Sequence, residues 1–373
     1  GEPTPPDILF KQVRGHIREG RYDLAAVFLR SFVESNPTDA DLLKIEADPA
    51  NGTTVFKQLR TIPVWSDDKK TDDQARADVE TVITKATAAT AKLLETPARV
   101  TKYIRNLAAT PEEQAFAEVE LRRTGDYAVP FMVDALRLSA NPSLTRGLLE
   151  AIPKMEGTTM AGWVAALDGL PPDLQLAVLN RIAARADYLD LLGFVQTNVI
   201  PRLWYAYGKA DTPAAVREHA AAALGKFYRD LEKRDPATEL AKLAEPFAEH
   251  VGRRYAGPPD AGPGRAIPVW TWDAKSEKVA KQADVSPGRA DEFYGLRYAK
   301  WALDVRPDAT KAQHLALTIA AEAAMERGKF GDLARTDPAV YRLLTDAPAG
   351  VLNDLLDTAL GKKRTAVVLA LTQ

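Results

Sequence analysis

The residue types that most often perform chemistry are few in this chain and form no known active-site pattern. The histidines are His16, His219, His250 and His314. None of them belongs to the His-Glu-x-x-His pattern, which places two zinc ligands on one face of a helix. Cysteine is absent, so disulfides, thiolate nucleophiles and cysteine zinc sites are excluded. We therefore expect no catalytic residue, no cofactor site and no metal site.

Two weaker patterns share one polar segment. Ser66 and Lys69 fit the Ser-x-x-Lys spacing, but they stand in a polar stretch rather than at the start of a helix. Four aspartates between positions 67 and 73 offer the oxygen ligands that calcium prefers. The spacing, glycine and closing glutamate of an EF-hand loop are missing, so the segment favours a solvated loop.

Aromatic side chains are the better candidates for binding. Trp204, Tyr205 and Tyr207 lie together just before Gly208, near the end of a predicted helix. In a helical-repeat protein such a cluster can line a groove and stack on a ligand or peptide. More often such a cluster fills the joint between neighbouring repeats, and the sequence leaves both roles open. We take these three residues as the candidate partner-binding residues.

The bulk composition limits the partners. Hydrophobic residues make up 46% of the 373 residues and charged residues 27%, with a net charge of −2. A phosphate-binding surface normally carries a cationic excess, so we expect no nucleic-acid partner. No apolar run approaches the roughly 18 residues that span a bilayer, so we expect no membrane-spanning segment.

The two ends of the sequence suggest a processed or longer polypeptide. The polar, proline-rich stretch from Gly1 to Pro6 is similar to the start left after removal of a signal peptide. Residues 365–373 stop within an apolar helical pattern. These features favour a bacterial, exported protein in the periplasm or cell envelope slightly over a cytoplasmic one, with this chain as part of a larger polypeptide.

The hydrophobic periodicity predicts helices along most of the chain. Paired helices are expected in 7–37, in 71–255, and again at 288–305, 309–327, 338–346 and 349–373. Glycine and proline dominate 256–264, which predicts a linker. Two short extended straps are expected near 61–65 and 266–273. In the second, Trp270 and Trp272 point the same way and would clamp the linker against the C-terminal helices.

Two repeat families supply a resemblance. The stretch Gly20-Arg-Tyr-Asp-Leu-Ala-Ala to Asn36-Pro37 resembles the second half of a tetratricopeptide repeat, and 298–308 is similar without the Gly-x-Tyr turn. Residues 112–136 resemble a complete HEAT-like hairpin, and residues 213–225 resemble a single HEAT-like repeat helix. The resemblance implies an all-α solenoid of stacked helical hairpins. It divides the chain into a tetratricopeptide-like part (1–70), HEAT-like repeats (71–255), a linker with a strap (256–287), and tetratricopeptide-like then HEAT-like helices (288–373).

The resemblance favours a non-enzymatic scaffold or adaptor that presents a helical surface to a protein or peptide partner. Two alternatives stay open. One is an enzyme on a HEAT-like scaffold, such as a DNA glycosylase or a lyase, which requires a basic concave face with aromatic and carboxylate residues at its centre. The other is a structural subunit that self-associates.

Overall fold

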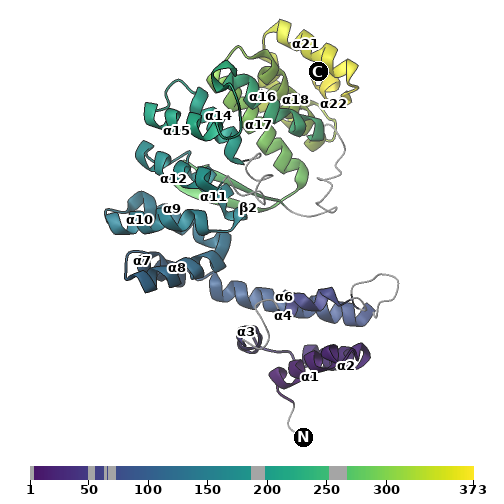
Figure 1. The fold of residues 1–373 in the computed structure, drawn as a ribbon. Helices are drawn as coiled ribbons and strands as arrows, with labels where there is room; N and C mark the ends of the chain where they lie inside the picture. The colour runs from purple at the N-terminus through teal and green to yellow at the C-terminus, as the bar shows by residue number, and fades with distance from the viewer. Residues whose placement is uncertain (1–3, 49–54, 63–64, 66–72, 186–197, 252–266) are drawn as a thin grey trace. The chain divides into compact units, whose positions relative to one another are not determined.

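The computed structural model describes residues 4–48, 55–62, 65, 73–185, 198–251 and 267–373 (Figure 1). Contacts divide the chain into two compact units, Gly1–Lys102 and Tyr103–Gln373. Apart from one β-hairpin, the regular structure of the described residues is helical, and successive helices pack against each other. The fold is therefore all-α, with stacked helical hairpins as expected. The finer boundaries at 70, 255 and 287 stay predictions.

The first unit is built around a cluster of phenylalanines. Its helices are α1 (Pro6–Arg18), α2 (Tyr22–Glu34), α3 (Asp39–Ala47), α4 (Val55–Gln58), the 3-10 helix η1 (Leu59–Thr61) and α6 (Asp73–Leu94). Gly20, with φ of +72°, turns the chain between α1 and α2. The ring of Phe10 lies 5.3 Å from that of Phe32 and 4.9 Å from that of Phe56. Aromatic packing thus joins α1, α2 and α4.

The strap predicted near 61–65 is not a strand in its described residues. Thr61 ends η1, Ile62 has extended backbone angles and Trp65 is helical. Ile62 and Trp65 are both buried in the core of the first unit. Pro63 and Val64 lie outside the described residues, as does the linker at 256–264.

The second unit contains a longer series of helices, and α7 (Pro97–Asn106) crosses from the first unit into it. The series comprises α8 (Pro111–Thr124), α9 (Ala128–Leu138), α10 (Pro142–Ala151), α11 (Met160–Ala166), α12 (Pro172–Arg185), α14 (Ile200–Gly208), α15 (Ala214–Leu224), α16 (Pro236–Val251), α17 (Pro287–Val305), α18 (Thr310–Arg327), α19 (Leu333–Thr336), α20 (Pro338–Thr345), α21 (Ala349–Gly361) and α22 (Thr365–Leu371). Local signals set many helix ends. Thr110 and Glu113 form a capping box at the start of α8, and Gly125 ends that helix with φ of +62°.

The second predicted strap is confirmed as strand β1 (Ile267–Asp273), which pairs antiparallel with β2 (Lys278–Val285). Asp273 closes the turn because its carboxylate accepts hydrogen bonds from the Lys275 amide and the Ser276 hydroxyl. The hairpin packs on α9 and α11. The ring of Trp270 lies against Gly162 of α11, so the expected clamp onto the C-terminal helices is wrong for this residue.

Helix α18 is the centre of the C-terminal part. Ten consecutive residues, from Ala316 to Met325, are buried, which leaves no exposed face in the middle of the helix. Helices α16 and α17 contact α18, and so do α20, α21 and α22. Five of the ten residues are alanines, whose small side chains let neighbouring helices approach closely.

A balanced ionic cluster fixes the last helices to α16 and α18. The guanidinium of Arg364 lies 2.9 Å from Glu322 and 2.9 Å from Glu249, and it donates to the carbonyl of Ala248. Lys362 also pairs with Glu249, at 2.9 Å. We call these four charged residues the Arg364 cluster. Burial raises the pKa of Glu322 to about 7 despite the opposing effect of Arg364.

Candidate functional site

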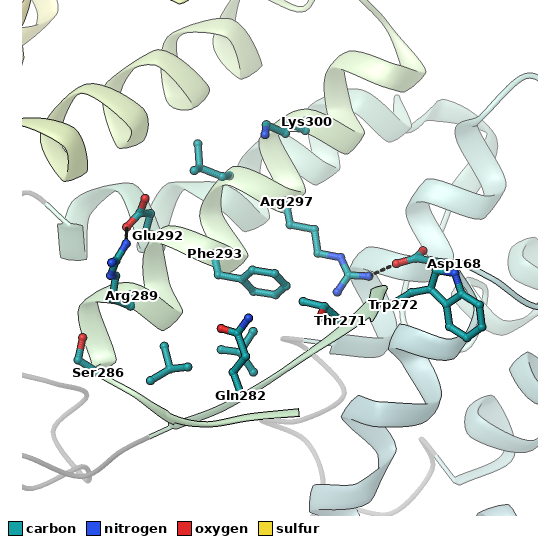
Figure 2. A pocket seen from close by; sticks show the side chains of 13 residues that line it. Asp168, Thr271, Trp272, Gln282, Ser286, Arg289, Glu292, Phe293, Arg297 and Lys300 are labelled. Carbon is teal, nitrogen blue, oxygen red and sulfur yellow. Dashed lines mark hydrogen bonds and ion pairs between the residues drawn. The ribbon is translucent and has the colours of Figure 1, made fainter. Parts of the chain in front are cut away.

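A cavity of about 900 Å³ lies between the β-hairpin and α17 (Figure 2). This volume is in the range of small-molecule and peptide-side-chain sites. The turn after α11 contributes Asp168, the hairpin contributes Trp272 and Gln282, and α17 contributes the remaining polar wall. Its lining consists of Asp168, Val269, Thr271, Trp272, Gln282, Val285, Ser286, Arg289, Glu292, Phe293, Leu296, Arg297 and Lys300. We call it the hairpin cavity.

One face of α17 supplies a stripe of cations and an aromatic ring. Arg289, Phe293, Arg297 and Lys300 recur at intervals of three or four residues, which places them along one side of the helix. Phe293 points from α17 into the cavity and Gln282 points toward it from β2 (Figure 2). Arg289 and Arg327 both pair with Glu292, whereas Lys300 has no ion-pair or hydrogen-bond partner among the described residues.

Asp168 holds two guanidinium groups at one end of the cavity. Its two oxygens lie 2.6 Å from Arg202 and 2.6 Å from Arg297. Arg202 also donates to the carbonyl of Leu167 at 2.9 Å. The side chains of Arg202 and Arg297 are only 10% and 15% exposed, so a single carboxylate faces two largely buried cations. We call these three residues the Asp168 cluster.

The surroundings of Arg202 lower the pKa of its guanidinium group. Desolvation lowers the pKa of Arg202, Asp168 opposes that change, and the nearby Arg297 adds to it. The guanidinium stays charged because its ordinary pKa is far above neutral. The Asp168 cluster therefore has an excess of positive charge, and its two arginines are poorly exposed to solvent.

Stacked aromatic rings support the two arginines. Tyr205 and Trp301 stack with ring centroids 4.8 Å apart and an interplanar angle of 14°. The guanidinium carbon of Arg297 lies 4.5 Å from the centroid of Trp301, and that of Arg202 lies 5.5 Å from it. Cation–π contacts of this kind hold a guanidinium in place without neutralising it.

Gly169 explains how the hairpin comes so close to Asp168. A Cβ atom at this position would lie 1.8 Å from the indole of Trp272. Only glycine leaves room for the ring against this turn, which follows α11 directly. The contact fixes β1 beside the residue that orients Arg297.

The three predicted aromatic residues do not form a single site in the structure. Trp204 is fully buried, with its ring 5.1 Å from that of Tyr228 and 6.1 Å from that of half-buried Tyr207. Tyr205 points elsewhere, toward Trp301, and lines a second cavity of about 360 Å³ together with Arg202 and Lys209. Of the three, only Tyr205 joins the charged residues at the Asp168 cluster.

Sequence reasoning missed Asp168, Arg202, Arg297 and Lys300. The spacing of Phe293, Arg297 and Lys300 was a readable signal for one helix face. Nothing local pointed to Asp168, which is 129 positions from its partner Arg297.

The described residues contain no group of three or more His, Asp or Glu side chains that could hold a metal ion. The predicted Ser66–Lys69 pattern lies outside them, and so do the aspartates at 67, 68 and 72. Within the same part of the chain, no helix is long and apolar enough to cross a membrane. His250 lies 3.4 Å from Asp291, and burial lowers the pKa of His219.

Comparison with protein-family models, curated proteins and solved structures finds no match to this chain.

Proposed function

We propose that this protein is a non-enzymatic scaffold or adaptor that holds a segment of a protein partner in the hairpin cavity. The observation that carries this proposal is the cavity itself, with an aromatic ring from α17 between cationic side chains. Such combinations of aromatic and arginine side chains are enriched where proteins bind one another. The helical-repeat resemblance agrees with a chain that presents a surface rather than a catalytic centre.

The bonding of the two cavity carboxylates also supports binding over catalysis. Both oxygens of Asp168 already accept hydrogen bonds from guanidinium groups. One oxygen of Glu292 accepts a hydrogen bond from Arg327, and the other lies 3.7 Å from the guanidinium of Arg289. A general base needs a free oxygen within reach of a substrate proton, whereas these carboxylates orient the cations around them.

The cavity also meets one requirement of the enzymatic alternative, because it combines cations, aromatic rings and carboxylates. A DNA glycosylase would use such a site to hold a flipped base. The overall charge of −2 weighs against phosphate-backbone binding. A duplex containing a methylated base, incubated with the purified protein, distinguishes this alternative by release of the base.

The proposal is tested by selecting peptides from a random display library on the full chain and measuring their affinities by fluorescence anisotropy. Phe293→Ala is expected to weaken the selected peptides at least about ten-fold, the scale of a hot-spot residue. Phe116→Ala is the matched control, since Phe116 is 56% exposed on α8 and does not line the cavity. The proposal is wrong if no peptide is selected, or if both variants weaken the peptides equally.

Membership of the HEAT-like and tetratricopeptide-like families, export, a bacterial source and self-association remain proposals on the sequence arguments given above. Light scattering of the purified chain tests self-association directly. A monomer at high protein concentration would remove the self-assembling subunit from consideration.

A further inference from the structure

The residues that line the hairpin cavity carry more positive than negative charge, and this excess indicates the charge of the partner that would fit. Three cations and two carboxylates line the cavity. At its Asp168 end, Arg202 adds a further cation from behind the wall. Lys300, about one turn beyond Arg297 on α17, has no ion-pair or hydrogen-bond partner among the described residues. A ligand that brings negative charge would satisfy groups that the chain leaves uncompensated.

The stripe on α17 has the dimensions of a short extended peptide. From Arg289 to Lys300 the helix rises about 17 Å, at roughly 1.5 Å per residue. About five residues of an extended chain cover that length. Because Phe293 stands between the cations, a fitting segment needs an apolar side chain flanked by acidic ones.

We propose that the hairpin cavity binds an acidic peptide segment, in which carboxylates pair with Arg297 and Lys300 and an apolar side chain packs on Phe293. This inference rests on the proposed scaffold function and names its partner chemistry. Arg297 is already held by Asp168 and stacked on Trp301, so its remaining donors are positioned before the ligand arrives. Preorganised guanidinium groups bind carboxylates with two parallel hydrogen bonds.

The balance of charge favours this partner over a nucleic acid. A nucleic acid brings a run of phosphates that extends beyond the cavity, and the net charge of −2 provides no general excess of cations to bind them. A peptide can place its carboxylates at the cations and its apolar atoms beside Trp272 and Phe293. Electrostatic matching of this kind adds specificity and makes binding sensitive to salt.

The test uses the full chain and a fluorescein-labelled peptide of about ten residues in which a central leucine is flanked by glutamates on both sides. The matched peptide carries glutamine in place of every glutamate. We expect the acidic peptide to bind at least about ten-fold more tightly than the glutamine peptide, and to weaken as salt rises.

Lys300→Glu is expected to weaken the acidic peptide at least about ten-fold, and Lys300→Arg to retain its binding. Lys11→Glu makes the same charge change on α1, where Lys11 is exposed and does not line the cavity, and should leave affinity unchanged. Lys300 is exposed, so its variants are expected to fold.

The outcomes separate this inference from the proposed function. If library-selected peptides depend on Phe293 but the acidic and glutamine peptides bind alike, the acidic partner is wrong and the scaffold function stands. The same holds if Lys300→Glu and Lys11→Glu have equal effects. Tighter binding of a fluorescein-labelled DNA duplex, lost in Lys300→Glu, would overturn the peptide in favour of a nucleic acid.

Discussion

The second unit contains two buried arginine clusters that differ in their balance of charge. In the Arg364 cluster, two carboxylates meet an arginine and a lysine, and Arg364 and Glu322 are 9% and 3% exposed. In the Asp168 cluster, one carboxylate meets two arginines at the edge of a cavity. In a balanced cluster the charges neutralise one another and the ion pairs join the helices. An unbalanced cluster keeps an excess of positive charge that a bound anion would neutralise, as expected of a binding site.

The largest effect is expected from Arg364→Met, which leaves Glu322 without its cation. Removal of one partner from a buried ion pair costs about 3–5 kcal/mol of the free energy of unfolding. Urea unfolding at alkaline pH measures the loss. The double variant Arg364→Met with Glu322→Leu should recover most of it. If Arg364→Met lowers the free energy of unfolding by less than about 1 kcal/mol, the Arg364 cluster does not stabilise the packing of these helices.

A smaller loss, about 1–3 kcal/mol, is expected from Asp168→Asn, because the site is partly solvated and the guanidinium groups keep aromatic contacts. Adding about 10 mM sulfate at constant ionic strength tests whether the two clusters differ in anion binding, since an anion that binds the folded state stabilises it. Asp168→Asn should gain more stability from sulfate than Arg364→Met does. Equal gains in the two variants would mean that the Asp168 cluster has no special need for an anion.

The pH dependence of stability is expected to come from the Arg364 cluster. Burial raises the pKa of Glu322 from an ordinary 4.5 to about 7, and Arg364, Glu326 and Glu249 are the charged groups that act on it. Between these pH values the folded state binds a proton that the unfolded state does not. The stabilising contribution of Glu322 is therefore full below pH 4.5 and is lost as pH rises through about 7.

The measurement is the difference in unfolding free energy between the wild type and Glu322→Gln across that range. This difference should change by up to about 1.4 kcal/mol per pH unit, with the wild type losing stability relative to the variant as pH rises. Asp168→Asn is the control, and its pH profile should not reproduce that of Glu322→Gln. A flat difference would show that Glu322 has an ordinary pKa.

The smallest effect on stability is expected at Lys300. Because the side chain is exposed and without an intramolecular partner in the described part of the chain, Lys300→Ala should change unfolding by less than about 0.5 kcal/mol. Thermal unfolding measures this directly. An unchanged stability together with a loss of affinity for the acidic peptide would show that Lys300 contributes to binding and not to folding. A loss of more than about 1 kcal/mol would assign it a structural role instead.

The sequence predicted elements whose signals are local. Thr110 and Pro111 mark the start of α8, and apolar spacing located α17, α18 and α20. The span predicted at 349–373 is divided into α21 and α22, and the short helix α19 was not predicted. Strand β2 was missed because only Val279 among its described side chains is buried, so its residues show little alternation. Helix α18 was predicted from the length of its apolar pattern, although its middle has no exposed face.

The candidate site was less predictable, since its residues meet only in the folded chain. Asp168, Arg202 and Arg297 come from three separate segments, and a lone charge in each looks like an ordinary surface residue. Of the predicted aromatic residues, Trp204 proved to be core because adjacent helix positions face different directions. Tyr205, its neighbour, therefore reaches the charged cluster.

The all-round burial of α18 has a consequence for synthesis on the ribosome. Leu317, Ala321 and Ala324 are covered by residues of α21 and α22, such as Leu355 and Val367. Until those later helices have been translated and have left the exit tunnel, one apolar side of α18 faces water. The C-terminal half of the second unit can thus complete its packing only after α22 has emerged, and a nascent chain paused before α21 is expected to need a chaperone.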